Sequence, residues 1–82
     1  MERNTTKYVL KKRNKVVYVG ITDDPDRREA EHRLDKDFDS MVKIGNVSSR
    51  QGAELWETER IHQYMKNHDG HTPKYNQNTS GK

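Results

Sequence analysis

Residues 7–24 read KYVLKKRNKVVYVGITDD, and this stretch decides the fold. Residues 7–10 and 15–19 are rich in β-branched and aromatic side chains, which favour strands. The polar residues KKRN between them are typical of a turn. The two runs therefore predict an antiparallel hairpin whose second strand closes at Gly20.

A helix-start signal follows the hairpin directly. Asp24 suits the N-cap position, Pro25 suits the first helical position, and Asp26 lies near the positive end of the helix dipole. We therefore expect a helix over residues 25–35.

The second half of the chain repeats this order of strand and helix. Residues 40–47 (SMVKIGNV) predict a third strand, weakened by Gly45. Ser48 or Ser49 can cap a second helix that runs to about Asn67, where the turn-like HDGHTP begins. The predicted order of elements is ββαβα.

Composition limits what the chain can be. Its 82 residues make one small domain, 1–82, in which residues 77–82 are expected to be a frayed tail. The net charge of +3 permits a polyanionic partner without proving one, and the chain has no cysteine for disulfides or thiolate metal sites. No apolar run approaches a membrane span and the first residues lack a signal-peptide core, so we expect a cytoplasmic protein without membrane contact.

The second predicted helix carries one carboxylate on its apolar side. At 100° per residue an apolar stripe forms, and Glu57 projects into its middle while Glu59 falls well off it. A carboxylate that faces a core is costly unless it is paired or bound to a metal. Two interpretations stay open: a Glu at the edge of the stripe that bonds an arginine, or a Glu at the floor of a cleft that holds a hard cation. The stripe consists of Ala53, Trp56, Ile61, Tyr64 and Met65.

The first predicted helix places a cation beside a titratable ring. Arg28 and His32 are four residues apart and share one face. A guanidinium can clamp phosphate oxygens and an imidazole can accept or relay a proton. Taken alone, the pair is more typical of an ordinary solvated face in a charged chain, and Tyr8 and Tyr18 on the hairpin are more typical of packing than of catalysis.

Taken in order, these features resemble the GIY-YIG nuclease superfamily over about residues 6–76. The first signature, Gly-Ile-Tyr, is Thr6-Lys7-Tyr8 here and keeps only the tyrosine. The second, Tyr-Ile-Gly, is Tyr18-Val19-Gly20 here. The tyrosines of the two signatures are ten residues apart, a familiar spacing in this family.

The remaining motifs of the family follow in register. Arg28 follows Gly20 by eight residues, which selects it over Arg27 as the family's helix arginine, and His32 lies where a His or Tyr is common. Glu57 precedes Ile61 by four residues, as the family's metal-binding glutamate often does, and the segment Pro73-Lys74-Tyr75-Asn76 matches the family's Pro-x-Tyr-Asn. Ile21 stands where some relatives place a lysine that helps to lower a tyrosine pKa, a role that Lys7 or Lys15 would then have to fill.

The resemblance implies an α/β chain of the α+β type, with a three-stranded antiparallel sheet flanked by helices. It further implies an endonuclease that hydrolyses DNA with one divalent metal, Mg²⁺ or Mn²⁺. Glu57 would be the protein's carboxylate ligand, and Arg28 would neutralise charge on the scissile phosphate. The general base would be a tyrosine or His32, with Tyr8 or Tyr18 favoured and His32 then orienting or relaying. Asn76 would fix geometry through its amide by bonding near Tyr18 or the helix face. The sequence does not rank the two tyrosines.

Other features allow competing interpretations. A GIY-YIG fold that binds nucleic acid without cutting it is the main alternative, and a protein-interaction module is the other. A basic patch around the hairpin turn suits a DNA backbone or a solvated turn equally: Arg3, Lys11, Lys12, Arg13 and Lys15. Because so small a module reads little sequence alone, we expect low or structure-directed specificity, with a homodimer or a partner protein as a further source of specificity. Trp56, Tyr64 and Phe38 are interpreted as core residues, His62 as a surface residue, and His68 with His71 as a weak zinc motif.

Overall fold

The hairpin forms as predicted, and its strands are longer than the apolar runs. In the computed structural model, which describes residues 4–76, β1 (Thr5–Lys12) pairs antiparallel with β2 (Lys15–Thr22). The turn holds only Arg13 and Asn14, both with positive φ (54° and 65°), as a two-residue turn that follows the strand twist requires. The expectations for Arg3 and for residues 77–82 lie outside the described residues.

Gly20 does not end the second strand. It lies inside β2 and pairs with Tyr8 across the hairpin, and β2 continues to Thr22. The expected boundary was wrong because a glycine can also serve a strand interior where another group approaches the backbone closely.

β1 is the central strand of a three-stranded antiparallel sheet with the order β2-β1-β3. β3 (Ser40–Ser48) pairs with β1 from Lys11↔Ser40 to Thr5↔Ser48. Gly45, with φ of 62°, lies where this register shifts, so it accommodates an irregularity in the strand. β3 carries no buried residue, which is typical of an edge strand.

A second register shift shapes the other edge strand. Leu10 pairs with Tyr18 and Lys11 with Val16, so Val17 is the extra residue of a β-bulge in β2. Because of the bulge, the consecutive residues Val17 and Tyr18 both pack in one cluster with Tyr8, Leu10 and Phe38.

The two helices agree with their sequence signals. α1 (Pro25–Asp35) begins after Asp24, whose side chain accepts a hydrogen bond from the Arg27 N–H at 3.2 Å. α2 (Arg50–Asn67) is capped by Ser49, which accepts a hydrogen bond from the Gly52 N–H at 3.2 Å. Of the two serines considered, Ser49 is therefore the cap.

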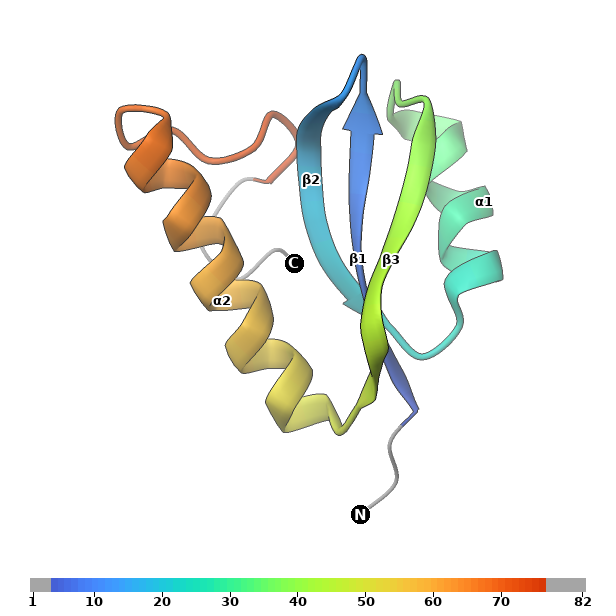
Figure 1. The fold of residues 1–82 in the computed structure, drawn as a ribbon. Coiled ribbons are helices and arrows are strands. Elements are labelled where there is room, and N and C mark those ends of the chain that lie inside the picture. Colours follow the sequence, from blue (N-terminus) through green and yellow to red (C-terminus); the bar gives the residue numbers. More distant parts are fainter. Residues whose placement is uncertain (1–3, 77–82) are drawn as a thin grey trace.

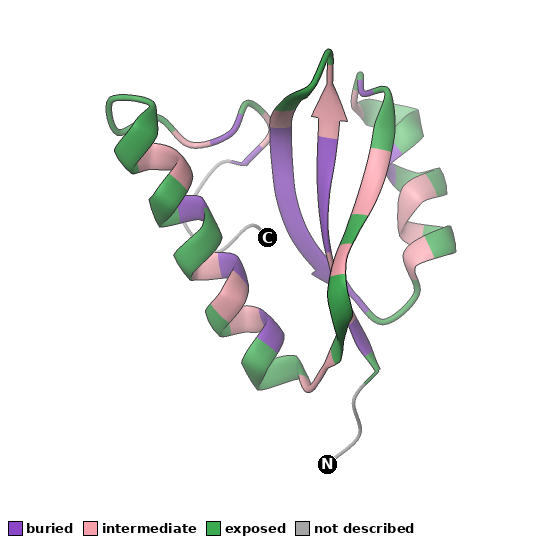
Figure 2. Ribbon diagram, viewed as in Figure 1, coloured by how far each residue is buried: buried purple, intermediate pink, exposed green. Residues whose placement is uncertain are grey.

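The helices lie on opposite faces of the sheet (Figure 1). On the α2 face, Ile61 packs with Val9 and Val19, and Trp56 and Met65 pack partly buried against them. On the α1 face lies the cluster that contains both signature tyrosines. Figure 2 shows that burial concentrates in β1, β2 and one stripe of α2, while α1 is largely exposed. Within residues 4–76 no helix is long and apolar enough to cross a membrane.

Candidate active site

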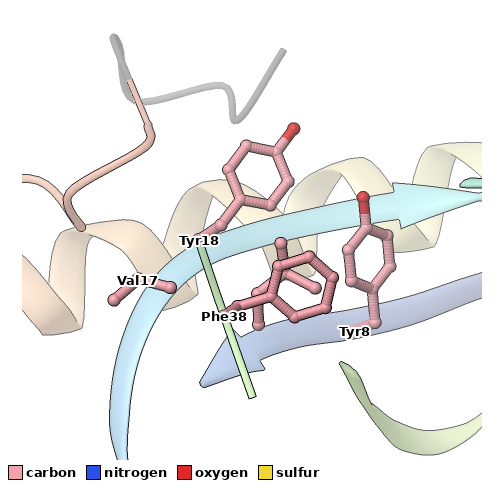
Figure 3. Packing of buried hydrophobic residues seen from close by; sticks show 5 residues of the cluster. Tyr8, Val17, Tyr18 and Phe38 are labelled. Carbon is pink, nitrogen blue, oxygen red and sulfur yellow. The ribbon is translucent and has the colours of Figure 1, made fainter. Parts of the chain in front are cut away.

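The hydroxyls of Tyr8 and Tyr18 form the centre of the candidate site. Both side chains rise from the α1 face of the hairpin with their hydroxyls directed to the same side (Figure 3). The two ring centroids lie 6.1 Å apart, and His32 of α1 packs over both rings at 5.7 and 4.9 Å. The Tyr8 hydroxyl is hydrogen-bonded to His32 Nε2 at 2.7 Å. Residues from three elements thus meet at one polar cluster.

Burial sets the protonation states of this cluster. It is the largest cause of a raised pKa in both Tyr8 and Tyr18, because desolvation penalises a phenolate. The hydrogen bond between the two hydroxyls further raises the pKa of Tyr8 and lowers that of Tyr18. Burial, followed by the charges of Lys36 and Arg28, lowers the pKa of His32 to about 4. His32 is therefore neutral at pH 7 and able to accept a proton.

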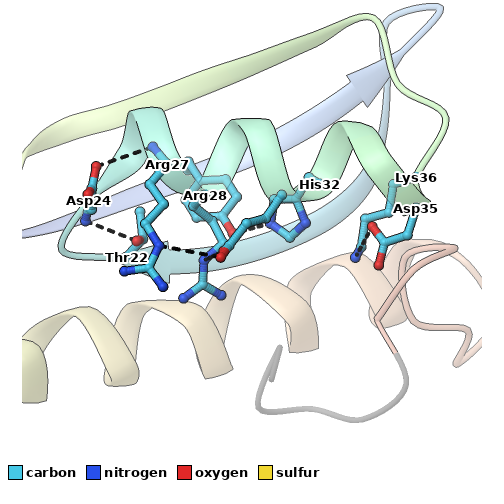
Figure 4. A network of polar contacts seen from close by, with 9 residues as sticks. Thr22, Asp24, Arg27, Arg28, His32, Asp35 and Lys36 are labelled. Carbon is cyan, nitrogen blue, oxygen red and sulfur yellow. Dashed lines mark hydrogen bonds and ion pairs between the residues drawn. The ribbon is translucent and has the colours of Figure 1, made fainter.

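Arg28 supplies the cation at the rim of this cluster. Its charge lowers the pKa of both tyrosines. Its Nε forms an ion pair with Glu31 at 3.2 Å, and the guanidinium points from α1 in the direction of α2 (Figure 4). The Arg28 side chain is 43% exposed and lines a small surface hollow with Thr22 and Asp24, so it is accessible to an anion from solvent.

Glu57 approaches the tyrosines from the other helix. Although it belongs to α2, only 2% of its surface is exposed, and its charge raises the pKa of both Tyr8 and Tyr18. Ala53 and Ile61, one turn to either side, are also buried, whereas Glu59 is exposed. The prediction that Glu57 projects into the apolar stripe is confirmed.

Asn76 acts on the backbone of β2. Its Oδ1 accepts a hydrogen bond from the Val19 N–H at 2.9 Å, and its Nδ2 donates to the Val19 carbonyl at 3.0 Å. Val19 lies between Tyr18 and Gly20, so the amide fixes the strand that carries the second signature motif. The resemblance implied a bond near Tyr18 or the helix face, and in the structure the amide bonds the residue after Tyr18.

The lysine nearest the tyrosines is neither Lys7 nor Lys15, the two that the sequence suggested. The Lys7 ammonium lies beside Gly45 of β3, and Lys15 lines a groove near Tyr64. Lys36 instead reaches the Tyr18 ring, with Nζ 5.2 Å from the centroid. Sequence reasoning missed Glu31 and also Lys36, the residue that directly follows α1.

Of the remaining predictions for aromatic and histidine residues, some are confirmed and one is wrong. Phe38 is buried with the tyrosines, and Trp56 packs partly buried on the α2 face. Tyr64 is only half-buried and lines a surface groove, so its assignment to the core was wrong. His62 is exposed, as expected.

A metal at this cluster would have few protein ligands. Within residues 4–76 no group of three or more His, Cys, Asp or Glu is placed to hold a metal ion. The donor set fits a hard cation that takes a single carboxylate, Glu57, and fills its other positions with water and phosphate oxygens. Mg²⁺ binds in this way more readily than Zn²⁺ does.

Comparison of the chain with protein-family models, curated proteins and solved structures gives no significant match.

Proposed function

We propose that this chain is a divalent-metal-dependent endonuclease of the GIY-YIG type that hydrolyses DNA phosphodiester bonds. One observation carries the proposal. A buried carboxylate from α2, Glu57, lies within electrostatic reach of two tyrosines whose neighbours are a neutral histidine and an exposed arginine. The ββαβα order and the order of the motifs along the chain support it.

The charges in the cluster match the requirements of phosphoryl chemistry. Arg28 is the exposed cation and would bind the scissile phosphate and neutralise charge that develops on it. The phosphate would have to displace Glu31 from its ion pair with Arg28. Glu57 would hold Mg²⁺ or Mn²⁺, and the bound ion would supply Lewis-acid stabilisation of the leaving oxygen.

Tyr18 is the better general base of the two tyrosines. The hydrogen bond between the hydroxyls favours the ionised form of Tyr18 and disfavours that of Tyr8. Tyr8 is fully buried and tied to His32. We therefore assign Tyr18 to the attacking water and Tyr8 with His32 to orientation and proton relay. Arg28 and the metal would supply the positive field that a tyrosinate needs near neutral pH.

The proposal is tested by exchanging one carboxylate at a time on α2. Glu57→Gln removes the charge of a buried residue and should lower Mg²⁺-dependent plasmid nicking by about a hundredfold or more, the range expected when a metal site is lost. Its melting temperature should be kept, because Gln retains the shape and most of the hydrogen bonds without a buried charge.

Glu59→Gln is the matched control, since Glu59 is exposed two residues further along the same helix. It should change neither nicking nor melting. Nicking that survives Glu57→Gln, or that is lost equally in Glu59→Gln, contradicts the metal assignment. A wild-type protein that binds DNA without nicking it is a non-catalytic binding module instead.

A further inference from the structure

A groove runs between the C-terminal half of α2 and the beginning of β2. It consists of two adjoining hollows with cavity volumes of about 230 and 400 Å³. The hollows share Val16, Tyr64 and His68, so they form one continuous surface feature. The proposed chemistry does not use these residues.

Two aromatic rings are already stacked in this groove. The rings of Tyr64 and His68 lie 3.8 Å apart and within 6° of parallel. His68 Nδ1 is 2.7 Å from the Tyr64 carbonyl oxygen, and since that oxygen can only accept, Nδ1 donates. The hydrogen bond holds the exposed imidazole against the half-buried phenol. A flat ring that joined this stack would meet side chains that are ordered in advance.

The polar groups of the groove match a nucleotide. Among residues 4–76, those that line it include no carboxylate and two cations, Lys15 and Arg60. Its amides each present a donor and an acceptor, as the edge of a nucleobase does: Asn14, Gln63 and Asn67. The hollow beside Arg28 differs, because three carboxylates line it together with Arg27 and Arg28.

The groove lies along the helix that carries Glu57. Tyr64 follows Glu57 by seven residues, so the two lie on the same face of α2 about 10 Å apart along its axis. Val19 lines the groove from the α2 face of β2, and Tyr18, the residue before it, packs on the opposite, α1 face. A 10 Å span corresponds to about three nucleotides at duplex spacing and to fewer in a stretched strand.

We propose that this groove binds an unstacked nucleobase of the DNA, on the Tyr64–His68 stack, a few nucleotides from the scissile phosphate. The inference rests on the proposed function and narrows its substrate to DNA with unpaired nucleotides beside the cut. Stacking on an aromatic ring tolerates every base, so the groove selects for strand structure and not for sequence.

The test uses an oligonucleotide with one 2-aminopurine in a single-stranded stretch, titrated with the full chain in EDTA so that no cleavage occurs. The wild type should quench the fluorescence of the unpaired base and leave that of the same base in a duplex unchanged. Tyr64→Leu should abolish the quenching and weaken binding of the single strand about tenfold, as loss of one stacked base does. Tyr64→Phe should keep both.

A pair of histidine variants gives a matched control on the same helix. His68→Ala should weaken single-strand binding, whereas His62→Ala should not, because His62 is exposed and outside the groove. These variants decide the matter if Tyr64→Leu fails to melt cooperatively. Unchanged affinity in both groove variants, or an equal loss for single strand and duplex, overturns the inference.

Glu57→Gln separates this inference from the proposed function. It should lose nicking and keep the 2-aminopurine quenching. If the wild type quenches the unpaired base and never nicks plasmid, the proposed nuclease function is wrong and the base-binding groove stands. If the wild type nicks plasmid without quenching the unpaired base, the base-binding groove is wrong and the proposed nuclease function stands.

Discussion

At the scale of single residues, Gly20 has a steric role in the hairpin that no other residue could fill. It faces Tyr8 across the hairpin, and a Cβ at this position would lie 2.6 Å from the Tyr8 hydroxyl and 2.6 Å from Cε2 of Tyr18. No side-chain carbon tolerates such contacts. The absence of a side chain therefore lets the Tyr8 ring lie across β2 and brings the two hydroxyls together.

Gly20→Ala should disrupt this arrangement more than it disrupts the fold. Overpacking of this kind costs about 1–3 kcal/mol in the free energy of unfolding, measurable by urea denaturation. Mg²⁺-dependent nicking should fall further than the loss of stability explains, because the tyrosine hydroxyls must move. Gly52→Ala is the control: its Cβ would lie 3.3 Å from Ser49 Oγ in a helix, and we expect a change within about 1 kcal/mol. Equal effects of the two substitutions would contradict the steric role of Gly20.

Residue-level reasoning from sequence succeeded where periodicity decides the answer. The 100° step around α2 placed Glu57 inside and Glu59 outside, and both are so. It did not rank Tyr8 against Tyr18, because their difference arises from mutual hydrogen bonding and burial in the folded state. Sequence reasoning also missed the ion pair between Glu31 and Arg28, because α1 carries several acids within reach of Arg28 and the sequence does not select one of them.

At the scale of elements, α1 is attached to the sheet in an unusual way. His32 is its one buried residue, and Leu34 is 88% exposed. Arg33 lies over the Phe38 ring at 4.5 Å and Lys36 over Tyr18 at 5.2 Å. An imidazole and two cation–π contacts thus do what aliphatic side chains do in α2.

This attachment should make the fold sensitive to mild acid. The pKa of His32 is about 4 in the folded chain, below the usual value of about 6.5, so the unfolded chain takes up its proton first as the pH falls. The contribution of neutral His32 to the free energy of unfolding is fully present above about pH 6.5. It is lost as the pH falls toward 4, by up to about 3 kcal/mol in total. Urea denaturation across this range should therefore show stability that rises with pH.

Two histidine variants isolate the contribution. His32→Phe should reduce the pH slope between 4 and 6.5 by about one proton. His62→Phe should keep the wild-type slope, because His62 is exposed. An identical slope in all three proteins would show that His32 does not carry the acid sensitivity.

The elements themselves were predictable to different degrees. Both helices match because their caps are local signals: Asp24 and Pro25 for α1, and Ser49 for α2. The pairing of β3 with β1 and the bulge at Val17 were not predicted. Register depends on contacts between distant segments, which no local pattern encodes.

At the scale of the whole molecule, the last described segment closes the fold at the edge of the sheet. The Tyr75 N–H donates to the Val17 carbonyl at 2.8 Å, and the Asn76 amide holds both polar groups of the Val19 backbone. Thr72 Oγ1 donates to the Asn76 carbonyl at 2.8 Å. A segment 57 positions away in sequence thus serves β2 as a short neighbouring strand would. Residues 73–76 therefore act on the candidate site through the backbone of β2.

The two hydrogen bonds between the Asn76 amide and the Val19 backbone predict different pH dependence of stability for two substitutions at position 76. Asn76→Ala leaves a buried N–H and C=O of Val19 without partners and should cost about 2–3 kcal/mol in urea denaturation. Asn76→Asp should cost more at pH 7, since a carboxylate can accept from the Val19 N–H and must repel the Val19 carbonyl. As the pH falls, the introduced carboxyl gains a proton that it can donate, so the Asp variant should recover relative to the Ala variant at each pH. Asn46→Ala, on the exposed part of β3, should stay within about 0.5 kcal/mol of the wild type. If the Asp and Ala variants at position 76 keep a constant difference across the titration, the amide does not bond both backbone groups of Val19.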